Sequence, residues 1–316
     1  MPAGRGTIAG AIALSLFAAF AWATWYLFVL WVTPGTTPSA ILAYPFLFGG
    51  IAYAGWAVAS GHGRAFAALW RSPMAWGRVG LLFGMQISVL AATYLTGPVD
   101  CSLLSLIGDV VLTPVLVALA IRAYRPTIAA PLFAVGLIIS LAGGTMAIVG
   151  GQRISAVTGW GWLAVPGVPL FVAGYFLLTA RANRTTPPAA VVAQSMLAAG
   201  ILVLLAAPIL PGGWGGILSV GPRPLLLLAL CGVTSFFLAP ALYFLALTKV
   251  GLVLPPMLMT AIPVFTLFLS AGILGIALPF IGVLGIPVAV LGGILALWGE
   301  SAVDPEKSPG PPEPSP

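Results

Sequence analysis

Ten long apolar runs follow one another along this chain, separated by short clusters of charged, proline and glycine residues. Each run is at least 20 residues long, and a helix of that length crosses the roughly 30 Å hydrocarbon core of a bilayer. The pattern therefore predicts transmembrane helices at 8–32, 39–60, 76–96, 100–121, 128–150, 157–180, 188–210, 224–246, 251–273 and 278–298. Residues 250–299 carry no charge, so the boundary between the last two helices rests on turn residues near 274–279.

The composition agrees with this pattern and excludes a soluble globular protein. Hydrophobic residues make up 60% of the 316 residues and charged residues only 6%, whereas soluble domains carry about 25% charged residues. We therefore predict an all-α integral membrane protein whose main partner is the lipid bilayer. The net charge is +6, but the basic residues stand singly or in pairs at the ends of the runs. That distribution argues against nucleic-acid binding.

The polar residues give no sign of a catalytic, metal or cofactor site. Cys101 and Cys231 lie on different predicted helices without metal-binding spacing, and the only histidine, His62, lies in a predicted loop. No phosphate-binding loop, Ser/His/Asp set or pair of catalytic carboxylates is present in the sequence. The chain is predicted to need no cofactor or metal, and to be neither an enzyme nor a nucleotide-driven pump.

The lysines and arginines predict the orientation, because cytoplasmic loops of membrane proteins are enriched in them. Placing both termini in the cytoplasm leaves only Arg153 and Arg223 outside. The residues then expected on the cytoplasmic side are Arg5, Arg64, Arg71, Arg78, Arg122, Arg125, Arg181, Arg184, Lys249 and Lys307. The tail 300–316 holds six prolines and is predicted to be disordered.

An internal repeat appears when the chain is shifted against itself by 149 residues. The aligned pairs include Tyr26 with Tyr175, Tyr94 with Tyr243, Pro114 with Pro263, Gly136 with Gly285, and Gly143 with Gly292. Seven tyrosines would give roughly 0.07 chance coincidences at one offset, so two are informative. We predict a five-helix repeat over 1–150 and a second over 151–299. Because five is odd, the second repeat is inverted, a design of many secondary transporters.

Several segments resemble a known family. They are 112–127 (LTPVLVALAIRAYRPT) with Gly136 and 141–144 (LAGG), 261–265 (AIPVF) with Gly285 and 291–293 (LGG), and 20–24 (FAWAT). These segments are similar to the EamA repeat of the drug/metabolite transporter superfamily. The resemblance implies that helices one to four and six to nine surround a central cavity, with five and ten peripheral. It also implies export of small metabolites or drugs across the bacterial inner membrane. Family members often carry a Glu after the fourth and ninth helices, and this chain does not.

Asp109 is the sharpest candidate for function. It lies within a predicted span and continues a polar stripe of Ser102, Ser105 and Thr113 at helical spacing. A carboxylate at that depth costs about 2.5–3.5 kcal/mol on insertion scales, so it is expected to face the protein interior or water. It would bind a substrate ammonium group, couple transport to protons, or serve as a structural acid bonded to a neighbouring helix.

Further candidates are an amide, three aromatic residues and two prolines. Gln86 lies midway along a predicted span, where an amide needs partners. Trp22, Tyr94 and Tyr243 would line a pocket or anchor helices at the interface. Pro114 and Pro263 lie inside predicted helices, as hinges for alternating access or as static kinks. The predicted site is therefore Asp109, Gln86, Ser105, Trp22, Tyr94 and Tyr243, with Pro114 and Pro263 as hinges.

Together these features predict a secondary transporter that exports a small metabolite, with amino acids as the leading substrate class. A multidrug exporter of cationic amphiphiles is the alternative. A channel is a less favoured one, because only one predicted helix has a clear polar stripe. Monomer and homodimer are both compatible with the sequence.

Overall fold

The computed structural model describes residues 5–108, 112, 115, 116, 119, 130–150, 161–183, 185–250, 254–275 and 280–301. Every regular element in these residues is a helix. In chain order they are α1 (Arg5–Val32), α2 (Pro38–Ala59), α3 (Gly63–Leu69), α4 (Pro73–Thr96), α5 (Pro98–Ile107), α8 (Pro131–Gly150), α9 (Gly161–Ala182), α10 (Pro188–Ala206), η4 (Ala207–Ile209), α11 (Gly213–Leu218), α12 (Pro222–Cys231), η5 (Gly232–Leu238), α13 (Ala239–Val250), α14 (Leu254–Met259), α15 (Ile262–Leu274) and α16 (Phe280–Ser301).

Proline and glycine mark where these helices begin and turn. Six of them, α2, α4, α5, α8, α10 and α12, begin at a proline, whose fixed φ suits the first helical position and whose missing N–H is not needed there. Gly97 adopts a φ of 101° between α4 and α5. Only glycine takes that conformation readily, and it allows the chain to reverse between two helices without a longer loop.

Five helices in the described residues are long and apolar enough to cross a membrane: Ala9–Val32, Pro38–Ala59, Pro73–Thr96, Pro188–Ile209 and Pro222–Ala246. They coincide with five of the predicted spans, and the protein is a multi-pass helical membrane protein. Shorter apolar helices lie at Pro131–Met146, Ala164–Thr179, Ile262–Leu274 and Phe280–Ala296. The predicted span 100–121 begins with α5 and continues beyond the described residues.

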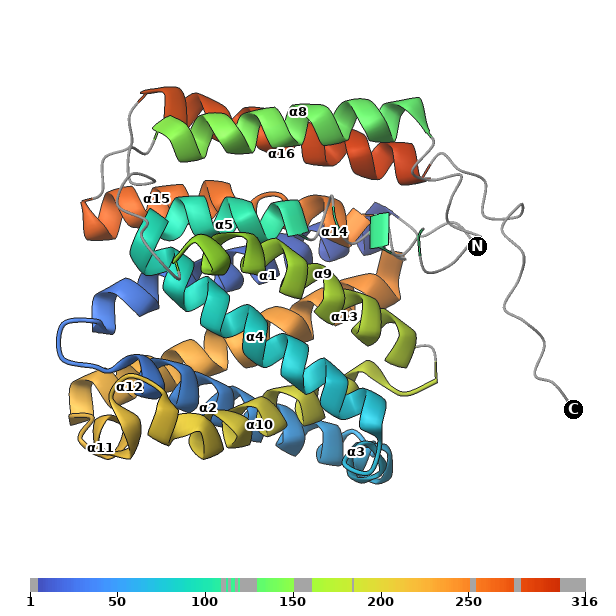
Figure 1. Cartoon of the computed structure of the whole chain (residues 1–316). Coiled ribbons are helices and arrows are strands. Elements are labelled where there is room, and N and C mark those ends of the chain that lie inside the picture. The colour runs from blue at the N-terminus through green and yellow to red at the C-terminus, as the bar shows by residue number, and fades with distance from the viewer. Residues whose placement is uncertain are drawn as a thin grey trace, which may run out of the picture.

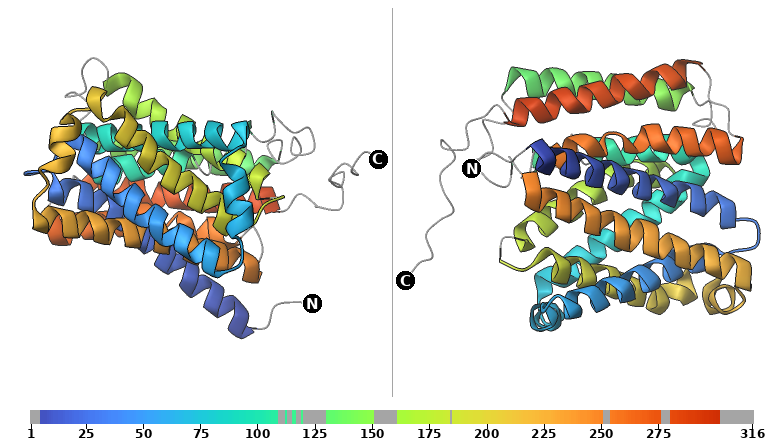
Figure 2. Two further views of the ribbon diagram at one scale, coloured as in Figure 1. Left: turned by 90° about the horizontal axis from the view of Figure 1, so that it is seen from below. Right: turned by 180° about the vertical axis from the view of Figure 1, so that it is seen from behind.

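Helices α8 and α16 form a pair at one edge of the bundle, as Figures 1 and 2 show. Glycines bring the two backbones into direct contact. A Cβ added at Gly136 would lie 2.7 Å from the carbonyl oxygen of Gly292, and one added at Gly292 would lie 2.7 Å from the carbonyl oxygen of Gly136. Gly143 approaches the Gly285 carbonyl in the same way. Small residues at such crossings are the usual means of helix association in lipid.

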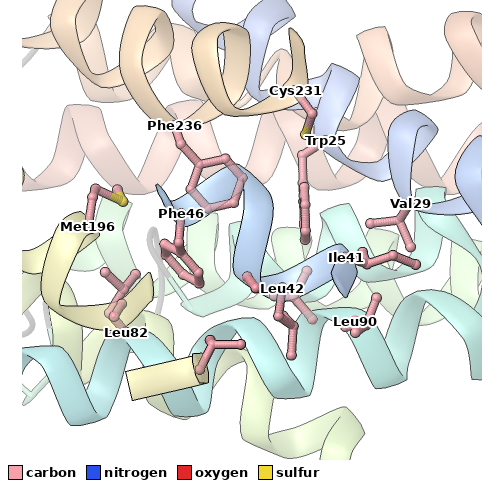
Figure 3. Packing of buried hydrophobic residues seen from close by; sticks show 14 of the residues in the cluster. Trp25, Val29, Ile41, Leu42, Phe46, Leu82, Leu90, Met196, Cys231 and Phe236 are labelled. Atoms are coloured by element: carbon pink, nitrogen blue, oxygen red, sulfur yellow. The ribbon is translucent and has the colours of Figure 1, made fainter. Parts of the chain in front are cut away.

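At the opposite edge of the bundle, α2 lies between α10 and η5 and also contacts α12. Gly49 and Gly50 leave no room for a side chain against Phe236 and Leu197, respectively. The ring of Phe236 packs on those of Phe46 and Trp25, with centroids 4.9 Å and 5.0 Å away. Figure 3 shows these rings grouped at the centre of the buried cluster.

The helix contacts come in matching sets. Helix α4 packs on α9, and α13 packs on α1; α5 contacts α9, and α15 contacts α1. The beginning of α1, helix α3 and the end of α16 lie at one end of the bundle, and α11 lies at the other (Figures 1 and 2).

Candidate functional site

A cavity of about 150 Å³ lies inside the bundle, a volume that holds a ligand of about the size of benzene. Its wall is built by residues of α1, α4, α5, α9, α10, η5, α13, α14 and α15. The described residues of α8 and α16 do not contribute, as the family resemblance implies. Those of α2 do not contribute either, although the second predicted helix was expected to line the cavity.

Aromatic rings form much of the wall. Trp22 of α1 packs on Tyr243 of α13 with ring centroids 5.6 Å apart, and both line the cavity. Tyr26 and Tyr175, which are 149 residues apart, line it from α1 and α9. The cavity is therefore suited to a ligand with a flat or apolar body.

The polar groups of the wall come from α1, α4, α5, α9, η5 and α13. The Tyr26 hydroxyl donates to Ser105 Oγ at 2.9 Å, and Ser105 in turn donates to the Cys101 carbonyl at 3.1 Å. The buried Gln86 Oε1 has no hydrogen-bond partner among the described residues, and neither does the indole Nε1 of Trp25. One is an acceptor and the other a donor, so the cavity retains capacity for a ligand that carries both kinds of group.

A π-helical segment, η5, brings further residues to the wall. Pro240 has no N–H to offer to the carbonyl of Phe236 four residues earlier, and its ring crowds that carbonyl. The wider turn of a π-helix relieves that conflict. Ser235 in this segment donates to the Ala21 carbonyl at 2.9 Å and lies 3.0 Å from Thr24 Oγ1. These two contacts hold η5 against α1 beside the cavity.

Arg78, which was expected on the cytoplasmic side near the start of the predicted span 76–96, is buried inside the bundle. It lies on the second turn of α4 and is only 1% exposed. Its Nε donates to Ser195 Oγ at 2.7 Å and its Nη2 to Gln194 Oε1 at 2.8 Å, both on α10. The positive charge lies near the end of a predicted helix, where it resembles an orientation signal, so nothing in the pattern indicated that it is buried.

The structure brings four of the predicted site residues together. Trp22, Gln86, Ser105 and Tyr243 all line the cavity. Tyr94 does not; its hydroxyl lies 2.8 Å from Thr33 Oγ1, near the end of α1.

The remaining predicted residues are placed differently. Asp109 and Pro114 lie outside the described residues. Pro263 is in the first turn of α15, after a break that follows α14. A proline suits the first turn of a helix, where its missing N–H is not needed, and it does not kink the helix there. Pro263 therefore lies at the start of a helix rather than midway along the predicted span 251–273, and it adjoins an interruption of the helical backbone.

Three lining residues, Tyr26, Tyr175 and Ser235, were not part of the predicted site, although the repeat contained a signal for each. Tyr26 and Tyr175 form one of the two tyrosine pairs that align at the offset of 149 residues. Ser235 aligns with Gln86 at the same offset, and both line the cavity. A search for aligned positions that are polar in both predicted halves would have identified Gln86 and Ser235.

Comparison with known proteins addresses the family and the fold. No curated protein sequence matches the chain. A crystal structure of another protein superposes with a TM-score of 0.65 and 20% identity, covering 94% of this chain and 99% of the other. That likeness shows a shared fold. Residues 159–298 match the model of the EamA-like transporter family. The predicted resemblance is thus confirmed for this part of the chain, which is similar to the EamA-like transporters.

Proposed function

We propose that the protein is a secondary transporter that exports small metabolites, with amino acids as the leading class, across the bacterial inner membrane by alternating access. The observation that carries this proposal is the cavity itself. It combines an aromatic wall with the unpaired acceptor Gln86 Oε1 and the unpaired donor Trp25 Nε1. An amino acid carries a donor and an acceptor in a small volume, which matches this lining.

The proposed architecture is ten helices in two inverted halves, 1–150 and 151–299. The crossing of α8 and α16 supports it. Gly136 contacts Gly292, while Gly143 contacts Gly285, so each glycine meets the repeat equivalent of the other. The matching contacts of α4 with α9 and of α13 with α1 support the same relation. Two similar halves in opposite orientation allow two near-equivalent packings, each open to one side.

The proposed orientation places both termini in the cytoplasm. The exposed Arg64 lies on α3, at the end of the bundle where α1 begins and α16 ends (Figure 1). The exposed Arg223 lies in the first turn of α12, beside α11 at the other end. Basic residues are concentrated on the cytoplasmic side of membrane proteins, which favours the α3 end for that side.

Export of cationic amphiphiles is the second candidate, supported by the aromatic wall. Rings such as Trp22 and Tyr243 attract cations through their faces. A volume of about 150 Å³ favours small metabolites over drug-sized molecules.

Counterflow in proteoliposomes tests the proposal. Vesicles loaded with one unlabelled amino acid should accumulate the labelled compound transiently, and uptake should saturate. A carrier gives this overshoot, whereas a channel or an enzyme does not. Gln86→Leu should reduce counterflow, while Tyr94→Phe, outside the cavity wall, should not. Absence of counterflow for every amino acid and quaternary ammonium compound tested would reject the carrier.

Proton coupling through Asp109 is a separate part of the proposal, based on its position in a predicted span. Asp109→Asn should alter the pH dependence of uptake into inside-out vesicles. Unchanged uptake at every pH would eliminate both its substrate-binding role and its coupling role. Hinge roles for Pro114 and Pro263 remain proposals on the same footing.

A further inference from the structure

Arg78 is a buried cation whose hydrogen-bond partners are all neutral. Its donors reach Ser195 Oγ, Gln194 Oε1 and, at 3.5 Å, the Val191 carbonyl. No ion pair to Arg78 is seen within the described part of the chain. Burying an uncompensated charge is costly in a protein interior and in a membrane. Such a charge is retained in the bundle where an anion is available to meet it.

The groups around Arg78 still have donors to offer. The Gln194 amide oxygen must face the guanidinium, because it accepts from Nη2. That leaves Gln194 Nε2 as a fully buried donor without a partner. Ser195 accepts from Arg78 and donates to the Val191 carbonyl at 2.9 Å, so its hydroxyl is already used. Arg78 Nη1 has no hydrogen bond to any described residue. Positive charge with spare donors matches a group that only accepts.

The cavity approaches this cluster from the other side. Leu82, one turn further along α4, lines the cavity, as does Val192 of α10, which lies about one turn before Ser195 on the same helix face. Tyr175 and Thr179 of α9 also line it, and the Tyr175 hydroxyl lies beside Ser195 and Thr179. Arg78 and Gln194 therefore lie behind one stretch of the wall, and a solute in the cavity reaches them when the side chains of that stretch move aside.

We propose that Arg78 and Gln194 form a binding site for the carboxylate of the transported solute, with its body in the aromatic cavity. Planar guanidinium groups bind carboxylates through paired hydrogen bonds, and Gln194 Nε2 supplies an additional donor. The proposal rests on the proposed transport function and defines its substrate class as carboxylate-bearing small molecules. It disfavours the cationic amphiphiles, which offer nothing to this charge.

Benzoate and benzamide test this site, because they share a ring of suitable size and differ in the carboxylate. We would follow thermal unfolding of the full chain in nanodiscs as each probe is titrated. Benzoate should stabilise the protein with an apparent Kd about tenfold or more below that of benzamide, the effect of one hydrogen bond to a charged group. Arg78→Met should remove this discrimination.

A second variant keeps the test decisive if Arg78→Met does not fold. Gln194→Glu places within the chain the carboxylate that the site lacks. It should raise the unfolding temperature and abolish benzoate binding, because Arg78 is then paired internally. Gln86→Glu is the matched control, since it introduces the same carboxylate on α4 about two turns away from Arg78. It should lower the unfolding temperature.

Several results would overturn the proposal. Equal binding of benzoate and benzamide would do so, as would discrimination that persists in Arg78→Met, or stabilisation by chloride to the same extent as benzoate. No benzoate-dependent stabilisation at all, or destabilisation by Gln194→Glu, would also reject it. Counterflow of neutral or cationic solutes by the unaltered protein would leave the transport function standing while this site failed. If the protein showed no counterflow but still bound benzoate more tightly than benzamide, the binding site would stand and the transport function would fail.

Discussion

Replacing Gly136 by alanine is expected to destabilise the protein, although alanine is the better helix former. In an exposed helix interior this change gains about 1 kcal/mol. At Gly136 the new Cβ would lie 2.7 Å from both the Gly292 carbonyl oxygen and the Cα of Ala296. Those neighbours are backbone atoms and cannot rotate away, so α8 and α16 must separate. Overpacking of this kind costs about 1–3 kcal/mol.

The control is Gly272→Ala in α15, where an added Cβ would meet no atom within 4 Å. Thermal unfolding of the purified protein in nanodiscs should show a higher or unchanged midpoint for Gly272→Ala and a lower one for Gly136→Ala. The contrast in sign is the informative quantity, because both changes improve helix propensity equally.

The double variant Gly136→Ala/Gly292→Ala sharpens the argument. Each added Cβ would meet the carbonyl oxygen of the other glycine at 2.7 Å, so one separation of the helices relieves both contacts. The two effects should therefore sum to less than their separate values, as expected for coupled sites. Full additivity, or a stabilised Gly136→Ala, would refute the close crossing of α8 and α16.

Three further predictions concern the cavity wall. Tyr26→Phe removes the hydroxyl that donates to Ser105 and should weaken solute binding severalfold in the counterflow assay, consistent with one net hydrogen bond of about 0.5–1.5 kcal/mol; Tyr94→Phe loses a bond of similar length and should not weaken it. Pro240→Ala restores the missing N–H, so η5 should tighten toward a regular α-helix, and solute affinity should fall with little loss of stability; unchanged affinity would separate the π-helical segment from binding. Trp22→Ala removes a ring from the wall and should raise the KM for transport more than it lowers the maximal rate, and an effect on rate alone would count against a role in binding.

Much of the helix pattern could be predicted from the sequence, because every backbone N–H and C=O group in a bilayer must be hydrogen-bonded within the protein. A run without charge must be a helix in a bilayer, and proline fixes its start. The sequence also contained a signal for the packing of α8 on α16, in the aligned glycines of the repeat. Gly136 and Gly143 have equivalents in Gly285 and Gly292, which the structure places in contact.

The site was only partly predictable, because a side chain's direction is decided by neighbours remote in the sequence. Gln86 was identified from its depth in an apolar run, and Ser105 from the polar stripe that it shares with Asp109. Arg78 was expected only as an orientation signal on the cytoplasmic side, because nothing near it in the sequence shows that Gln194 and Ser195 will surround it. Tyr94 was expected in the pocket because it aligns with Tyr243, yet only Tyr243 reaches the wall. The proposed repeat therefore aligns these two tyrosines in the sequence but not in their positions relative to the cavity.

The crossing of α8 and α16 has a consequence for the ancestry of the chain. Gly136 meets Gly292 and Gly143 meets Gly285, so a helix with glycines seven residues apart fits an upturned copy of itself. A half-length protein carrying this helix would need no second gene to find a partner. Copies inserted in both directions would pair through the same surface. Duplication and fusion would then only fix in one chain an assembly that already existed between two.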